Sequence, residues 1–185
     1  MLAGFALGLV AANAFEWVAH KYVLHGLGRK KDSFWAFHWH EHHKNVRKTG
    51  GEDPMYREPI LETPSKAKEI FGVALTTAIT APLLAVSPSF VAAGALSGIA
   101  YYAIHKQSHI DPAWGRKWVP WHMDHHLGPD QHKNWCVTTP LFDYVMGTRV
   151  PFIGTPPRRP PAGLHGRLRT RNRLIRQRSF AQSLN

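Results

Sequence analysis

Residues 70–104 read IFGVALTTAITAPLLAVSPSFVAAGALSGIAYYAI and contain no charged side chain. Ser87, Pro88 and Ser89 interrupt this run in the middle. Each arm has about 17 residues, which as a helix is roughly 26 Å long, close to the roughly 30 Å hydrocarbon core of a bilayer. We therefore predict a hairpin of two membrane spans, at about 69–87 and 88–106. A buried hairpin in a soluble protein is the alternative, which so long an uncharged run disfavours.

The N-terminus is the second uncharged stretch, because residues 1–15 also lack charged side chains. We predict a third span at about residues 2–19. Ala12, Asn13 and Ala14 resemble a signal-peptide cleavage site, but no positive segment precedes the apolar run, so we interpret it as a retained membrane helix. An amphipathic helix lying in the membrane plane over residues 1–25 is the alternative.

The basic residues are segregated along the chain. Of 185 residues, 23 are Lys or Arg and 12 are Asp or Glu, and all 23 cations lie within residues 21–68 and 106–178. The positive-inside tendency predicts that both blocks face the cytoplasm, with the N-terminus and the hairpin tip opposite. The basic stretch could attract nucleic acid or anionic lipid, and in a chain with apolar spans we expect anionic lipid and no nucleic acid.

These patterns predict an all-α integral membrane helical bundle with a histidine-rich cytoplasmic helical cap. We expect one membrane domain over residues 1–155 and a basic, partly disordered tail over residues 156–185. The single cysteine, Cys136, excludes an internal disulfide and every multi-cysteine metal framework.

Twelve of the 13 histidines fall into four groups near the expected cytoplasmic ends of the spans: His20 and His25; His38, His40, His42 and His43; His105 and His109; and His122, His125, His126 and His132. On an α-helix, the two members of the third group are about 40° apart, and the first three of the fourth share an arc of about 100°. His38 and His42 also share a face. His20 and His25 diverge by about 140°, so we expect one of them to lie past a helix end near Gly26.

So many imidazoles packed together favour metal binding, because neutral ring nitrogens can share a cation. Ten such ligands exceed the capacity of one ion, and a pair of nitrogen-bound metals beside a membrane favours redox oxygen chemistry over hydrolysis. The predicted ligands are His20, His25, His38, His42, His43, His105, His109, His122, His125 and His126. His40 and His132 are additional candidates. We expect the outer N–H of these ligands to bond to Glu41, Asp111, Asp124 or Asp143.

The spacing His20-x4-His25, the box ending His42-His43, His105-x3-His109 and His122-x2-His125-His126 resemble the fatty acid hydroxylase and sterol desaturase superfamily of membrane di-iron oxygenases. Residues 134–148, NWCVTTPLFDYVMGT, are similar to the segment that follows the last box in that family. The resemblance covers about residues 13–150. The family's second box would place a histidine at position 39, where Trp39 stands, so either His38 or His40 completes it, and we prefer His38 because it shares a face with His42.

The resemblance implies a membrane-bound hydroxylase of a fatty acyl, sterol or related lipid. It implies two iron ions, for which zinc can substitute in purified protein, molecular oxygen as co-substrate, and no catalytic residues beyond the metal ligands. Electrons would come from a separate protein of the ferredoxin, cytochrome b5 or reductase type. Alternatives are a carotenoid hydroxylase or lipid desaturase of the same superfamily, a membrane zinc hydrolase with Glu41 as base, and a non-enzymatic basic membrane adaptor.

Overall fold

A computed structural model describes residues 1–59 and 62–154 of the chain. It divides the chain into one unit of Met1–Ile153 and another of Gly154–Asn185. The predicted tail at 156–185, with its proposed disorder and lipid contact, lies outside the described residues. Within them the protein contains helices and no strand, which confirms the predicted helical class.

The helices of the first unit, in chain order, are α1 (Leu2–Val18), η1 (Ala19–Gly26), η2 (Leu27–Arg29), η3 (His38–His42), α2 (His43–Thr49), η4 (Pro54–Arg57), α3 (Pro64–Thr80), η6 (Ala81–Ala85), α4 (Pro88–Ile110), α5 (Pro112–Trp118), α6 (Pro120–Leu127) and α7 (Leu141–Val145). Proline occupies the first position of α3, α4, α5 and α6, where its fixed φ suits the helix and its missing N–H costs nothing. Prolines therefore mark where these helices begin.

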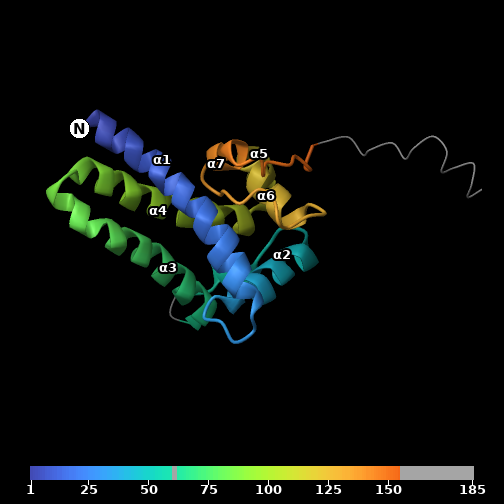
Figure 1. The fold of residues 1–185 in the computed structure, drawn as a ribbon. Coiled ribbons are helices and arrows are strands. Elements are labelled where there is room, and N and C mark those ends of the chain that lie inside the picture. Colours follow the sequence, from blue (N-terminus) through green and yellow to red (C-terminus); the bar gives the residue numbers. More distant parts are fainter. Residues whose placement is uncertain (60–61, 155–185) are drawn as a thin grey trace, which may run out of the picture. The chain divides into compact units, whose positions relative to one another are not determined.

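The predicted apolar hairpin is formed by α3 and α4. Its tip lies beside the N-terminal end of α1, while α2, α5 and α6 gather at the opposite end (Figure 1). Two continuous helical stretches, Leu2–Arg29 and Pro64–Ala85, are long and apolar enough to cross a membrane. Large apolar side chains such as Leu7, Ile79 and Ile99 are more than 60% exposed on the three long helices, as lipid-facing residues would be. The third span within α4, and the side of the membrane on which each end lies, remain predictions.

Two glycines bring α1 and α4 into close contact. A Cβ atom on Gly8 would lie 2.6 Å from the Phe90 carbonyl oxygen and 2.7 Å from the Ala93 Cβ, and one on Gly4 would lie 2.7 Å from the Ser87 and Ser89 hydroxyl oxygens. Gly4 and Gly8 are four residues apart and so share a helix face, as small residues do where membrane helices pack tightly. This contact holds α1 against the hairpin.

A π-helical segment, η1, continues α1 and corrects our expectation for His20 and His25. Both residues lie within η1, and their ring centroids are 5.1 Å apart. The π-helix closes its turn with i→i+5 bonds, so residues five apart come together, whereas on an α-helix they diverge. Neither histidine lies past the helix end. The segment η3 is also π-helical and includes His38 and His42.

Candidate metal centre

The ten predicted ligands come together at the end of the bundle away from the hairpin tip. They are contributed by η1, η3, the first residue of α2, the last turns of α4, and α6. Each of the ten side chains is at most 2% exposed. Such burial of ten imidazoles is costly unless their nitrogens have partners.

Five histidines form a first group: His20, His25, His38, His43 and His125. Their ligand atoms all lie within 4.8 Å of one another. The Nε2 atoms of His25 and His43 are 3.0 Å apart, and the His125 Nε2 lies 3.1 Å from that of His25. The Nε2 atoms of His20 and His38 are also 3.0 Å apart. The two π-helical segments thus supply three of the five members, the first residue of α2 supplies His43, and α6 supplies His125.

The second group contains His42, His105, His109 and His126, whose ligand atoms also lie within 4.8 Å of one another. The His122 Nε2 lies 2.9 Å from that of His109 and so adjoins this group. The rings of His43 and His126, with centroids 4.3 Å apart, connect the two groups. His38 and His42 belong to different groups, but their ring centroids are 5.3 Å apart, so the two residues share a face of η3 that is directed into the centre.

The outer nitrogens of six ligands contact oxygen acceptors. The Nδ1 atoms of His42, His43 and His105 lie 2.7 Å from Asp53 Oδ2, 2.7 Å from Gln131 Oε1 and 2.5 Å from Glu69 Oε1. Those of His20, His109 and His125 lie 2.5–2.8 Å from the backbone carbonyls of Trp135, Gly51 and Lys133. Because carbonyl and carboxylate oxygens accept, these Nδ1–H groups donate, and each Nε2 directs a lone pair into the cluster.

The inner nitrogens fit a metal. The Nε2 atoms of His42, His105 and His126 are buried and have no hydrogen-bond partner among the described residues. Elsewhere in the centre, Nε2 atoms face one another at about 3 Å, an arrangement that is stable when the two nitrogens share either a proton or a cation. Neutral imidazole nitrogens in this number suit zinc, copper, iron or nickel.

Burial also keeps these histidines in the neutral form that coordinates a metal. Desolvation lowers the pKa of His42, His43, His125 and His126 well below the usual value for histidine, and the neighbouring imidazoles lower it further. The rings are therefore neutral at pH 7 and available to coordinate a cation.

The carboxylates that contact ligand rings are Asp53 and Glu69, which the sequence interpretation missed. Tyr56 supports the contact between Glu69 and His105, since its hydroxyl donates to Glu69 Oε2 at 2.8 Å. Glu69 is the last charged residue before the apolar run, and that position is a signal that could have identified it. Asp53 follows the second histidine box by ten residues without a comparable signal.

The four carboxylates predicted for this role bond elsewhere. Glu41 is exposed and accepts from Ser65, and Asp111 caps the first turn of α5. Asp124 pairs with Arg149 at 2.7 Å, and Asp143 accepts the backbone N–H groups of Trp135 and Cys136. All four stabilise local structure around the centre.

The two additional histidines lie outside both groups. The His40 Nε2 contacts the carbonyl oxygen of Arg29 at 3.0 Å, which leaves His38 as the member of the second box in the centre. His132 is exposed, and its ring stacks on Trp39 with centroids 5.6 Å apart. The Trp39 ring packs beside the His25 ring, with centroids 5.0 Å apart.

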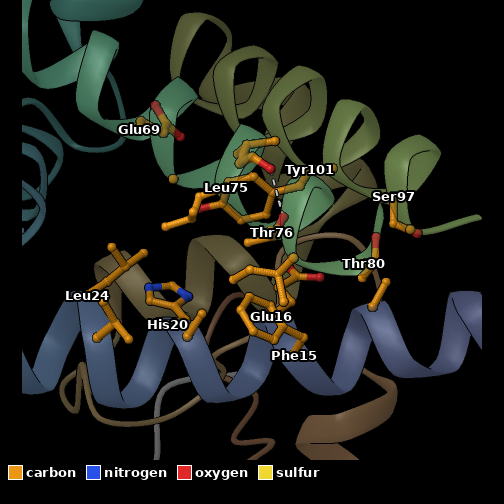
Figure 2. Close-up of a pocket in the computed structure, with 18 of the residues that line it drawn as sticks. Phe15, Glu16, His20, Leu24, Glu69, Leu75, Thr76, Thr80, Ser97 and Tyr101 are labelled. Atoms are coloured by element: carbon orange, nitrogen blue, oxygen red, sulfur yellow. Dashed lines mark hydrogen bonds between the residues drawn. The ribbon is translucent and has the colours of Figure 1, made fainter. Parts of the chain in front are cut away.

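A cavity of about 370 Å³ leads from the centre between α1, α3 and α4. Figure 2 shows His20 and Glu69 toward one end, with Thr80 and Ser97 toward the other. His38 and His42 also line it, while most of its wall is apolar. From His20 to Gly8, another lining residue, α1 rises roughly 18 Å. The cavity is therefore elongated, apolar and open to the histidines at one end.

An apolar helical hairpin, a buried multi-histidine centre and a connecting cavity define a membrane-associated metalloprotein class. The family model described as Fatty acid hydroxylase matches residues 5–148, and the chain belongs to this family, as its histidine boxes predict. The family consists of oxidoreductases that typically depend on a metal. No curated protein and no solved structure matches the chain.

Proposed function

We propose that the protein is a membrane-bound, oxygen-dependent lipid hydroxylase with two iron ions held by the ten buried histidines. The observation that carries this proposal is the arrangement of Nε2 atoms in two adjacent groups at the end of an apolar cavity. One group offers five ligands and the other four, with His122 beside the second. Two groups suit two ions better than one.

Iron in such a centre, once reduced, supplies the activation of oxygen needed to attack an unactivated C–H bond. One oxygen atom enters the C–H bond and the other leaves as water, which consumes two electrons and two protons. Asp53 holds the His42 ring in position by accepting from its Nδ1–H, and Glu69 holds the His105 ring in the same way. The Trp135 carbonyl accepts from the Nδ1–H of His20.

The cavity supports a substrate with a long apolar part, such as a fatty acyl chain, a sterol or a related lipid. Its wall would bury that part between α1, α3 and α4, with the reacting carbon near His20, His38 and His42. Desaturation and carotenoid hydroxylation use the same parts and are the alternatives within the family. The zinc-hydrolase alternative needs Glu41 as a base beside a metal, whereas Glu41 is exposed and bonded to Ser65, so we favour oxygen chemistry.

The proposal includes three membrane spans, with the histidine centre and the C-terminal tail on the cytoplasmic side and anionic lipid near the tail. It also includes a separate electron-transfer protein of the ferredoxin, cytochrome b5 or reductase type. His132 is exposed and stacks on Trp39, and Trp39 packs against the ligand His25. The His132 side chain therefore offers the electron donor a contact close to the centre. We expect no nucleic-acid partner.

Lipid mass spectrometry of cells that express the protein tests the function. Wild-type protein is expected to produce a lipid with one additional oxygen atom, and His125→Ala is expected to abolish it. His40→Ala is the matched control, because His40 lies outside both ligand groups and should retain activity. Full activity of His125→Ala, or a product with no added oxygen and no loss of hydrogen, would contradict the proposal.

A second variant separates substrate binding from metal binding. Gly94 lines the cavity, and a Cβ built there meets no atom within 4 Å, so Gly94→Phe should place a ring in the cavity without distorting α4. We expect product formation to fall at least tenfold while metal content stays at the wild-type value. An unchanged product yield would show that the substrate does not occupy this cavity.

A further inference from the structure

The segment 137–148, which includes α7, is hydrogen-bonded to side chains in the C-terminal part of α1. Asn13 Nδ2 donates to the Thr139 carbonyl at 2.9 Å, and Asn13 Oδ1 accepts from the Phe142 N–H at 3.1 Å. Glu16 accepts from the backbone N–H of Thr138 at 3.0 Å. Trp17 Nε1 donates to the Thr148 hydroxyl at 2.9 Å. An amide and a carboxyl group in a membrane helix thus find partners in this segment.

These contacts place α7 beside a defined part of α1. The N-terminal end of α1 lies at the level of the hairpin tip, because Gly4 packs against Ser87 and Ser89. From Leu2, α1 rises about 16 Å to Asn13 and about 22 Å to Trp17. Along α3, Lys68 lies about 26 Å from the tip, where its ammonium group can reach the membrane surface. The level of Asn13 and Trp17 is therefore inside the boundary that Lys68 indicates.

The outer face of α7 is apolar. Leu141, Tyr144, Val145 and Met146 are between 44% and 66% exposed. Leu9 and Val10 of α1 are also exposed, and they precede the turn that holds Asn13. The apolar face of α7 thus continues an exposed apolar surface of the span to which it is bonded.

Most backbone N–H groups of the segment have hydrogen-bond partners in the protein, as a medium without water requires. The N–H groups of Val137, Thr138 and Phe142 are bonded to α1, and the N–H groups of Trp135 and Cys136 bond to Asp143. Within and after α7, Tyr144, Met146, Gly147 and Thr148 donate to carbonyls of the same segment. Irregular backbone is found at membrane depth where protein groups satisfy it in this way.

We propose that residues 139–146 are embedded in the lipid, as an element that enters the cytoplasmic side of the hydrocarbon layer without crossing it. Its apolar side chains contact acyl chains, and Asn13 and Glu16 anchor it to α1. Asp143 connects this element to the metal centre, since it holds the N–H of Trp135, whose carbonyl contacts His20. The inference rests on the membrane insertion of α1 in the proposed function.

Site-directed spin labelling tests this placement directly. Cys136 is fully buried, so wild-type protein should take up no label and single new cysteines can be labelled selectively. Val145→Cys and Tyr144→Cys probe α7, Leu7→Cys reports the lipid-facing side of α1, and Lys48→Cys reports water. All four positions are exposed, and unchanged thermal unfolding would show that the variants fold. The purified full chain is reconstituted in vesicles of phosphatidylcholine and phosphatidylglycerol.

Power saturation then compares collision with molecular oxygen, which concentrates in lipid, and with a water-soluble nickel chelate. We expect labels at positions 144 and 145 to match position 7, with oxygen favoured over nickel at least threefold, and position 48 to show the reverse. Nickel access at 144 and 145, with lipid access at 7, would overturn this inference and leave α1 in the membrane. Nickel access at all four positions would overturn both the lipid-embedded position of α7 and the membrane insertion of α1. Labels at 144 and 145 that neither reagent reaches would mean that protein covers α7, which also contradicts the inference. None of these readouts depends on metal or activity.

Discussion

Six of the ten ligand rings are oriented by an oxygen acceptor at the outer nitrogen. Glu69 reaches from α3 to the Nδ1 of His105, a residue 36 positions later, and Asp53 reaches the Nδ1 of His42. Each carboxylate fixes the tautomer that directs Nε2 inward. A buried carboxylate at this position also strengthens the ligand as a base.

Glu69→Gln tests this arrangement at the residue scale. The amide keeps the size of the side chain but removes the charge, so we expect metal affinity to fall about 10–100-fold. Competition with a chelator, followed by metal analysis of the purified protein, measures the change. Glu41→Gln is the matched control, because Glu41 contacts Ser65 and should leave affinity unchanged. Equal affinity in both variants would contradict a role for Glu69 in holding His105.

At the scale of the element, the contact between α1 and α4 depends on the absence of a side chain at Gly8. Gly8→Val would press a branched side chain against Phe90 and Ala93, and we expect it to destabilise the protein by about 1–3 kcal/mol. Thermal unfolding in detergent measures this loss. Gly26→Ala is the control, because its Cβ would lie 3.6 Å from the nearest atom, at ordinary contact distance. Similar unfolding temperatures for the two variants would show that the contact is loose.

The three long helices of the fold could be predicted from local sequence, whereas the short helices around the site and several details of the site could not. The hairpin follows from a long uncharged run with a Ser-Pro-Ser break, and the histidine groups follow from spacing alone. The π-helical turns at His20–His25 and His38–His42 could not be predicted, because they contradict the ordinary helical period and depend on the packing of the rings. Partners such as Glu69 and His105 are far apart in sequence, so only the folded chain brings them together.

At the scale of the whole molecule, the buried histidines couple stability to pH. Burial lowers the pKa of His42, His43 and His125, so the folded protein binds fewer protons than the unfolded chain, whose histidines titrate near pH 6.5. This contribution to stability is therefore present above about pH 6.5 and is lost as the pH falls. We expect the unfolding temperature in detergent to decrease from about pH 7.5 to about pH 5.5. An unfolding temperature that stays constant or rises as the pH is lowered over that interval would contradict the claim that the buried histidines are neutral.

Two metal ions in one histidine centre are the basis of the proposed activity, so the most direct test is the metal content of the purified chain. Elemental analysis should find about two ions per chain in the wild type and in His40→Ala. It should find about one in the double variant His25→Ala, His125→Ala, which depletes the first group, and about one in His105→Ala, His109→Ala, which depletes the second. A wild-type chain that binds no metal, or double variants that both retain the wild-type content, would contradict the proposed centre.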